Sequence, residues 1–330
     1  MKTTKIKKKK LRVFNYPWHL AHQYNLQKFK WIDWDWLIQH HRQYNDLPRG
    51  DFFKGDYVTH YEAGKYDFAL LHLDQQCMEH NIWSRGKGQL YRELNEQIQD
   101  IPKIIIMHGT PCYPEAFETK EELIEKTKEV IGDNLVIVNS KKAAEQWGFG
   151  TPIWHGLNKE EWVDLPKEPR VITMIGPAGL DFYYDRTFLN AVKEYLMEEG
   201  IMHCHITVDW SAKNWDDYKE FLGRSLLYFH PSKESPMPRA RTEAMLSGCC
   251  VLTTPWQDAD TFIEDGKNGF IVPRNPKEVV DKIKYLIKNY NQTIKIGQEG
   301  KKTAEKIFTH QRYEQDWKDF IEKNLNIKIQ

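Results

Sequence analysis

The chain has 330 residues, of which 40% are hydrophobic and 28% charged, so it is long enough for about two domains and its composition argues against disorder. Its 47 lysines and arginines balance its 47 aspartates and glutamates, which argues against a protein dedicated to nucleic-acid binding. The five cysteines form no CxxC pair and no apolar run is long enough to span a bilayer, so we expect a cytoplasmic protein without a disulfide framework or a zinc ribbon.

Short apolar runs alternate with longer helical stretches in the first half of the chain. Strands are predicted at residues 11–16, 68–73, 103–108 and 135–138, and helices at 115–131 and 141–147. Continuous apolar strands that alternate with helices are typical of a parallel sheet covered on both faces. The next segment, 158–170, is polar and holds two prolines, and it is interpreted as an interdomain linker.

The same alternation restarts after the linker. Strands are predicted at 171–175, 203–208, 226–230, 250–253 and 269–272, and helices at 187–199, 241–247, 276–289, 292–307 and 311–324. Because open parallel sheets bind ligands at the carboxyl ends of their strands, two such domains should hold a ligand between them. We therefore expect two Rossmann-like α/β domains facing across a cleft, at 1–160 and 161–310, and a final helix at 311–330 that packs back toward the first domain.

Two common nucleotide-binding motifs are missing from the sequence. No GxGxxG fingerprint follows the first predicted strand, and no GxxxxGK[ST] loop is present. Their absence argues against an ordinary NAD-dependent dehydrogenase and against a P-loop NTPase.

The most informative stretch is 228–254, where a strand ends in Pro231 and Ser232, and a loop with Glu234 leads to a helix. A helix N-terminus presents unpaired N–H groups and about half a positive charge, which suits a diphosphate. Arg239 and Arg241 lie where the helix begins and could add forked contacts to phosphate.

This stretch resembles the C-terminal domain of the family 4 retaining glycosyltransferases, which have the GT-B fold. The shared pattern is Pro-Ser, a glutamate, then Glu-Ala-Met with Glu243, a glycine, a strand, and Asp-Gly-x-Asn-Gly at 265–269. The resemblance covers about residues 225–275. It extends more weakly to Val136-Ile-Val-Asn-Ser140, the nearby Trp147, His155-Gly-Leu-Asn158 and His108-Gly-Thr-Pro111.

The resemblance implies a role for several of these residues. It implies that Glu243 holds the ribose, that Glu234 lies at the donor sugar with the backbone amides of Ser235 and Met237, and that His108 touches the sugar from the other domain. The sequence departs from the pattern because eight residues, not seven, separate the two glutamates, so either Glu234 or Ser235 takes the first-glutamate position. Prolines 236 and 238 also remove two backbone donors.

The phosphate contacts of the family are replaced in this sequence. The usual Gly-Arg and Lys-Gly pairs are absent, and Gly176, Gly179 and Arg186 are the candidate substitutes, the alternatives being a plain turn and a surface arginine. The loop 258–260 takes the place of the family's Gly-Gly-x-x-Glu motif.

The reaction that the resemblance implies is transfer of a hexose from a nucleotide diphosphate sugar, expected to be UDP-linked, to a hydroxyl with retention. It needs no metal, no cofactor and no protein nucleophile, because amides and arginines stabilise the leaving diphosphate. The acceptor stays open between a glycan, a lipid-linked glycan, a protein and a modified DNA base. The alternatives are a nucleotide-sugar epimerase of the same fold and a non-catalytic nucleotide-sugar binding scaffold.

The N-terminal half is unusually rich in aromatic residues, notably Trp18 and the segment 31–37, which holds Trp31, Trp34 and Trp36. Tryptophan faces stack on sugars and bases, or lie at a lipid interface beside basic residues such as those at 7–12, which would give a peripheral membrane contact. The alternative is that these tryptophans belong to the core. No feature of the sequence indicates an obligate protein partner.

Overall fold

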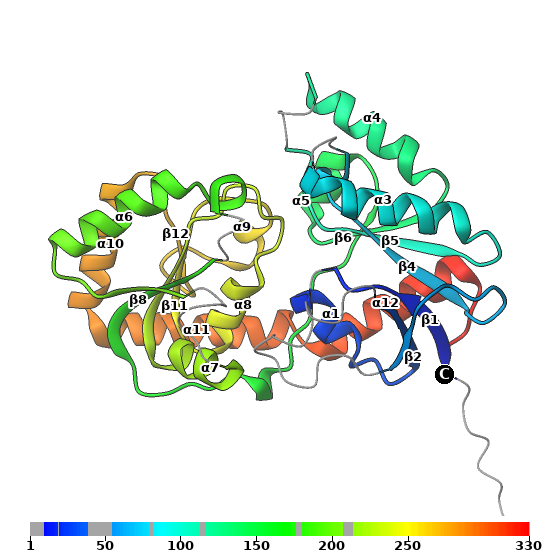
Figure 1. The fold of residues 1–330 in the computed structure, drawn as a ribbon. Helices are drawn as coiled ribbons and strands as arrows, with labels where there is room; N and C mark the ends of the chain where they lie inside the picture. Colours follow the sequence, from blue (N-terminus) through cyan, green and yellow to red (C-terminus); the bar gives the residue numbers. More distant parts are fainter. Residues whose placement is uncertain are drawn as a thin grey trace, which may run out of the picture.

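The computed structural model describes residues 10–18, 20–38, 55–78, 82–112, 117–175, 180–206 and 214–329. They form two α/β lobes, each built on one parallel sheet with helices on both faces (Figure 1). The predicted class, two parallel sheets in tandem, is confirmed. Among these residues, no helix is both long and apolar enough to cross a bilayer.

The N-terminal lobe has a seven-stranded sheet in the order β3-β2-β1-β4-β5-β6-β7. Its strands are β1 (Leu11–Asn15), β2 (Ile32–Leu37), β3 (Asp56–Val58), β4 (Phe68–Leu73), β5 (Lys103–Met107), β6 (Leu135–Val138) and β7 (Thr151–Pro152). Its helices are α1 (Leu20–Leu26), α3 (Ile82–Gln97), α4 (Lys120–Ile131) and α5 (Lys141–Trp147), with short turns η1 (Gln75–Met78) and η3 (Lys159–Glu161). The strand order reverses between β1 and β4, which is where ligands bind in such sheets.

The C-terminal lobe has a five-stranded sheet in the order β12-β11-β10-β8-β9. Its strands are β8 (Glu168–Met174), β9 (His203–Ile206), β10 (Ser225–His230), β11 (Cys250–Thr253) and β12 (Phe270–Ile271). Its helical segments are η5 (Leu180–Tyr184), α6 (Arg186–Glu198), α7 (Trp215–Arg224), α8 (Arg239–Leu246), α9 (Ala259–Phe262), α10 (Pro276–Lys288) and α11 (Tyr290–Ile307). The strand order reverses between β8 and β10.

Several boundaries differ from the prediction. The predicted linker 158–170 is wrong at its end, because β8 begins at Glu168 and pairs there with β10 despite the nearby proline. The helix predicted from residue 115 begins at Lys120, where Thr119 caps it by accepting a hydrogen bond from the Glu122 N–H. The helix predicted from 241 begins two residues earlier, at Arg239.

The tryptophan-rich segment is strand β2, which the sequence analysis did not predict. Trp34 and Trp36 are buried on the sheet face that packs against Trp317 and Phe320 of the last helix, α12 (His310–Leu325). Trp31 precedes the strand and is buried in the same cluster. The core interpretation is therefore confirmed for these three tryptophans, and stacking on a ligand or a lipid is wrong for them.

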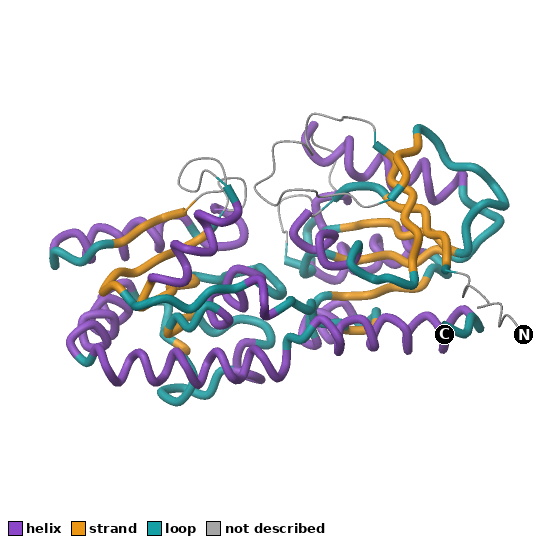
Figure 2. Tube along the Cα trace, turned by 90° about the horizontal axis from the view of Figure 1, so that it is seen from below, coloured by secondary structure: helices purple, strands orange, loops and turns teal. Residues whose placement is uncertain are grey.

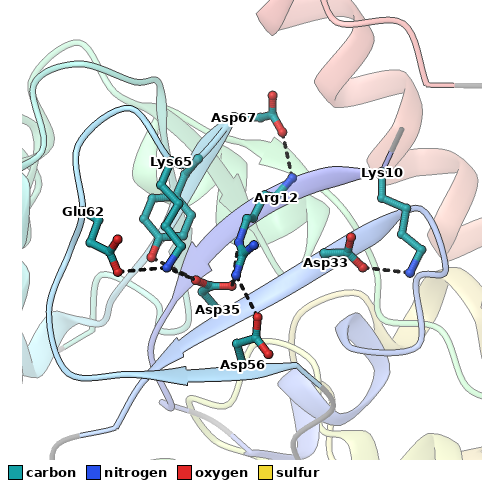
Figure 3. A network of polar contacts seen from close by, with 9 residues as sticks. Lys10, Arg12, Asp33, Asp35, Asp56, Glu62, Lys65 and Asp67 are labelled. Carbon is teal, nitrogen blue, oxygen red and sulfur yellow. Dashed lines mark hydrogen bonds and ion pairs between the residues drawn. The ribbon is translucent and has the colours of Figure 1, made fainter. Parts of the chain in front are cut away.

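Two aspartates of the same segment have opposite surroundings (Figure 3). The Asp35 side chain is buried and pairs with Arg12 at 2.8 Å and with Lys65 at 3.1 Å, and it accepts a hydrogen bond from Tyr66. Asp33 points outward and forms an exposed ion pair with Lys10. The carboxylate of Asp35 thus holds β1, β2 and the chain before β4 together.

The chain crosses between the lobes twice, and the two crossings touch. After α11 the chain enters α12, which lies against the N-terminal lobe (Figures 1 and 2). The Leu157 N–H donates to Phe308 O at 2.9 Å, which joins the first crossing to the second. A Cβ added at Gly156 would lie 2.3 Å from Tyr313 Cβ, so only glycine allows this approach.

Candidate functional site

The loop and helix after β10 form the core of the candidate site. Helix α8 begins after Pro238, and no side chain caps its first turn. The first N–H groups of a helix have no partner within the helix, so this end carries partial positive charge. It therefore offers an anion-binding position of the kind that the sequence predicts.

Glu243 lies in α8 and is buried, with 1% of its surface exposed. Its Oε2 accepts a hydrogen bond from the Tyr218 hydroxyl of α7 at 2.8 Å. Its Oε1 lies 3.8 Å from Arg239 Nε, one turn earlier on the same helix. The carboxylate is therefore held by two neighbours, and a ribose would have to reach it beside the Tyr218 hydroxyl.

Arg241 is fully buried and forms no ion pair with any residue that the structure describes. Its guanidinium donates to Thr253 at 3.3 Å, contacts the Met237 sulfur at 3.6 Å and lies over the Phe262 ring at 5.1 Å. Burial lowers the pKa of Arg241 to about 10, so the group stays charged at neutral pH. Its charge acts inside the lobe beside the start of α8, and its direct contact with a phosphate remains a prediction.

The loop with Glu234 touches both lobes. The Glu234 N–H donates to Tyr183 O at 3.0 Å, and its carbonyl accepts from Thr110 of the N-terminal lobe at 3.2 Å. Its Oε2 is buried and has no hydrogen-bond partner among the residues that the structure describes, and burial raises the pKa of the Glu234 carboxyl. Ser235, the next residue, is partly buried. The structure thus brings Glu234 to the loop that follows β5.

His108 begins that loop. Its Nε2 lies 3.0 Å from Nδ1 of His72, and its ring is stacked on Trp18. A Cβ on the next residue, Gly109, would lie 1.5 Å from Oε1 of Gln75, so a larger residue there would have to displace the end of the Gln75 side chain. His108 and Glu234 therefore lie on two loops that meet through Thr110, and their contact with a sugar stays a prediction.

Two arginines lie near the start of α6, and the sequence analysis named one of them. Arg186, the predicted substitute for a phosphate lysine, is half exposed and forms a bidentate pair with Asp181 at 2.8 and 3.0 Å. Arg274, which the sequence analysis missed, donates to Ser232 O at 3.0 Å and to Asp185 at 3.0 Å. Arg274 follows shortly after strand β12, and a cation close to the end of a parallel strand was the sequence feature that could have identified it. The contact of Arg186 with phosphate stays a prediction, and Gly176 and Gly179 lie outside the described residues.

The loop 258–260 joins the two lobes. Asp258 is fully buried and accepts hydrogen bonds from the backbone N–H groups of Lys141 and Lys142 at 2.7 and 3.0 Å, and from Trp154 Nε1 at 2.6 Å. A carboxylate at the N-terminus of α5 is also favoured by the helix dipole. Asp260 forms an exposed ion pair with Lys142. This loop therefore connects the lobes in the structure.

Comparison with known proteins agrees with this geometry. Residues 192–303 match the family model described as Glycosyl transferases group 1. Among curated proteins, spore coat protein SA of Bacillus subtilis (strain 168) is 25% identical over 148 residues, which are 44% of this chain and 39% of that protein. The chain thus matches well under half the length of that relative.

Solved structures resemble the chain over most of its length. Anabaena Alr3699/HepE in complex with UDP and glucose has a TM-score of 0.68 at 13% identity, covering 95% of this chain and 100% of that chain. Sucrose-phosphate synthase from Thermosynechococcus elongatus has a TM-score of 0.64 at 12% identity, covering 95% and 99%. The predicted GT-B fold is confirmed, and the match over 192–303 confirms the prediction of a glycosyltransferase domain.

Proposed function

We propose that the chain is a retaining, metal-independent glycosyltransferase of family 4 that moves a sugar from a UDP-sugar to a hydroxyl of an acceptor bound by the N-terminal lobe. The observation that carries this proposal is the uncapped start of α8 with Glu243 one turn further on. The presence of UDP and glucose in the Anabaena structure supports UDP as the nucleotide.

The donor would be held mainly by the C-terminal lobe. The diphosphate binds the N–H groups at the start of α8, where the charges of Arg239 and Arg241 add positive potential. Glu243 accepts hydrogen bonds from the ribose hydroxyls. The further cations for the leaving phosphate would be Arg274, which donates to Ser232 O in the loop after β10, and Arg186 at the start of α6.

The sugar would lie between the loops of Glu234 and His108, which meet through Thr110. Preorganised donors and cations stabilise the negative charge that develops on the leaving diphosphate, and this needs no protein nucleophile. The leaving phosphate can take the proton of the acceptor hydroxyl on the same face of the sugar, which gives retention. No step requires a metal or a cofactor.

A screen of nucleotide sugars tests this proposal. UDP-sugars should raise the melting temperature, and the bound donor should be consumed when a hydroxyl acceptor is supplied. NMR of the product should show the anomeric configuration of the donor, and a chelator should leave the rate unchanged. An inverted product would contradict retention, and a chelator-sensitive rate would contradict metal independence. Epimerisation of UDP-N-acetylglucosamine without an acceptor would contradict the transferase assignment.

A further inference from the structure

One arginine links the two chain segments that flank the reversal of strand order in the C-terminal sheet. This reversal lies between β8 and β10, and parallel sheets bind ligands at such a point. Arg274, which follows β12, donates through Nη1 to Ser232 O, in the segment after β10, at 3.0 Å. Its Nη2 donates to Oδ2 of Asp185, in the segment between β8 and α6, also at 3.0 Å. The guanidinium therefore has one arm on each segment.

The same two segments also meet through their backbones. The N–H groups of Lys233 and Glu234 donate to Tyr183 O at 2.8 and 3.0 Å. Tyr183 belongs to η5, a π-helical turn that ends immediately before Asp185. Turns of this kind are rare and are frequent at functional sites. Arg274 thus spans two segments that already lie side by side at the ligand-binding edge of the sheet.

Asp185 has a structural role and a charge that this role does not need. Its Oδ1 accepts a hydrogen bond from the Phe188 N–H at 3.1 Å and so caps α6, while Oδ2 pairs with Arg274. Its φ is 66°, which a residue other than glycine seldom adopts. Strained residues persist where surrounding contacts hold them, and they gather at functional sites. Asparagine would also cap the helix and tolerate this backbone, so the carboxylate charge needs a separate reason.

The ion pair between Asp185 and Arg274 is weak enough to exchange. The two side chains are 36% and 30% exposed, so water screens their attraction. A phosphate offers the guanidinium a forked, charge-assisted contact that is stronger than a partly exposed pair. A diphosphate at this point of the sheet would therefore compete with the carboxylate for the same arm of Arg274.

Both partners stay anchored when this one contact changes. Arg274 keeps its bond to Ser232 O, and its guanidinium carbon lies 4.6 Å from the centroid of the buried Phe188 ring. Asp185 keeps the Phe188 N–H, and its negative charge is favoured by the dipole of α6. Only the bond between Nη2 and Oδ2 has to break.

We propose that the pair between Asp185 and Arg274 is an autoinhibitory contact, in which the carboxylate occupies the arm of Arg274 that a diphosphate takes when it binds. This inference rests on the proposed function for the identity of the ligand. It makes Asp185 a competitor of the diphosphate, which weakens the binding of UDP and favours its release after transfer.

Calorimetry with UDP, inorganic pyrophosphate and uridine tests this contact. Asp185→Asn keeps the cap of α6 and removes the charge. We expect it to bind UDP and pyrophosphate at least about threefold more tightly, because Arg274 is no longer occupied. Uridine carries no phosphate, and its affinity should change less than about twofold. A gain in affinity cannot come from unfolded protein, so a less stable variant would still give a valid result.

Two further variants complete the test. Arg274→Gln should weaken the binding of UDP and of pyrophosphate at least about tenfold, because it removes the phosphate contact itself. Glu199→Gln is the matched control, since Glu199 lies just past the other end of α6 and forms an ion pair of similar exposure with Lys284. It should bind all three compounds like the wild type.

Three results would overturn the proposal. One is an Asp185→Asn protein that binds UDP and pyrophosphate no more tightly than the wild type, and another is an Arg274→Gln protein with wild-type affinity for both. The third is a structure with bound pyrophosphate in which Nη2 of Arg274 is still bonded to Asp185. A wild type that binds pyrophosphate with the expected variant pattern but does not bind UDP would support the exchange and contradict the proposed function. A wild type that binds neither would overturn both.

Discussion

The two lobes place a buried histidine at the same point of their sheets, but they surround it differently. In the N-terminal lobe His72 lies where the strand order reverses and is hydrogen-bonded to the uncharged amide of Asn15 and to the ring of His108. In the C-terminal lobe His230 ends β10 at the corresponding reversal, and burial together with the charge of Arg241 lowers its pKa.

This difference indicates a division of labour. A guanidinium buried beside a helix N-terminus favours an anion, whereas a chain of neutral hydrogen bonds favours hydroxyl groups. Under the proposed function, the C-terminal lobe would hold the diphosphate of the donor and the N-terminal lobe would contact a sugar. The predictions below test this division and the connection between the lobes.

The largest expected effect concerns the connection. Asp258→Ala removes the carboxylate that accepts hydrogen bonds from Lys141 N, Lys142 N and Trp154 Nε1. These three donors would be left without their acceptor, so the free energy of unfolding should fall by about 2–5 kcal/mol. Asp260→Ala removes an exposed ion pair with the same segment and should cost less than about 1 kcal/mol. Urea denaturation measures both, and equal losses would contradict the role of Asp258.

The next prediction separates structural charge from ligand-binding charge. Asp35→Asn removes the charge of a buried carboxylate that forms ion pairs with Arg12 and Lys65, so it should lower the free energy of unfolding by about 1–3 kcal/mol. It lies in the N-terminal lobe, and we expect UDP affinity to stay within about twofold. Asp33→Asn is the control, because its ion pair is exposed and should contribute little. A large loss of UDP affinity in Asp35→Asn would contradict the assignment of UDP binding to the C-terminal lobe.

Glu243→Gln should show the opposite behaviour. Glutamine keeps the volume and an acceptor for the Tyr218 hydroxyl, but it removes the charge that favours the ribose hydroxyls. We expect UDP to bind at least about tenfold more weakly, which is about 1.4 kcal/mol, with a smaller change in stability. Calorimetry measures the dissociation constant, and an unchanged value would remove Glu243 from the site.

The last expected effect is a pH dependence at the crossing between the lobes. Burial, and then the charges of Arg239 and Arg312, hold the pKa of His155 well below its ordinary value of 6.5. Below pH 6.5 the unfolded chain therefore binds a proton that the folded chain does not, so stability falls on acidification by up to about 1.4 kcal/mol per pH unit.

His155→Gln should reduce this slope, measured as the unfolding free energy between pH 7 and pH 5. His60→Gln changes an exposed histidine and is the control. The slope of His60→Gln should match that of the wild type. A wild-type slope in His155→Gln would show that the pKa of His155 is not lowered in the folded state.

The sequence predicted the C-terminal lobe better than the N-terminal one for a physical reason. Glu234, Arg241 and Glu243 lie within ten residues, on one loop and one helix, so their spacing along the chain reflects their arrangement in space. Asn15 and His72 come from separate strands, and only the pairing of β1 with β4 brings them together.

Local patterns also left particular residues undecided. Trp34 and Trp36 were open between a ligand-stacking surface and the core, and the core interpretation holds because one face of β2 is covered by α12, from the far end of the chain. For Arg186 the sequence did not predict the surface ion pair with Asp181, five residues earlier, and its contact with phosphate stays a prediction. Such contacts depend on how the chain turns between elements, and the residue pattern does not determine them.

A structure of the protein with bound UDP tests the central claim most directly. We predict that the diphosphate lies at the N-terminus of α8, against the N–H groups that follow Pro238, and that the ribose hydroxyls are bonded to Glu243. UDP bound elsewhere, with the start of α8 and the Glu243 carboxylate free of nucleotide, would contradict the account.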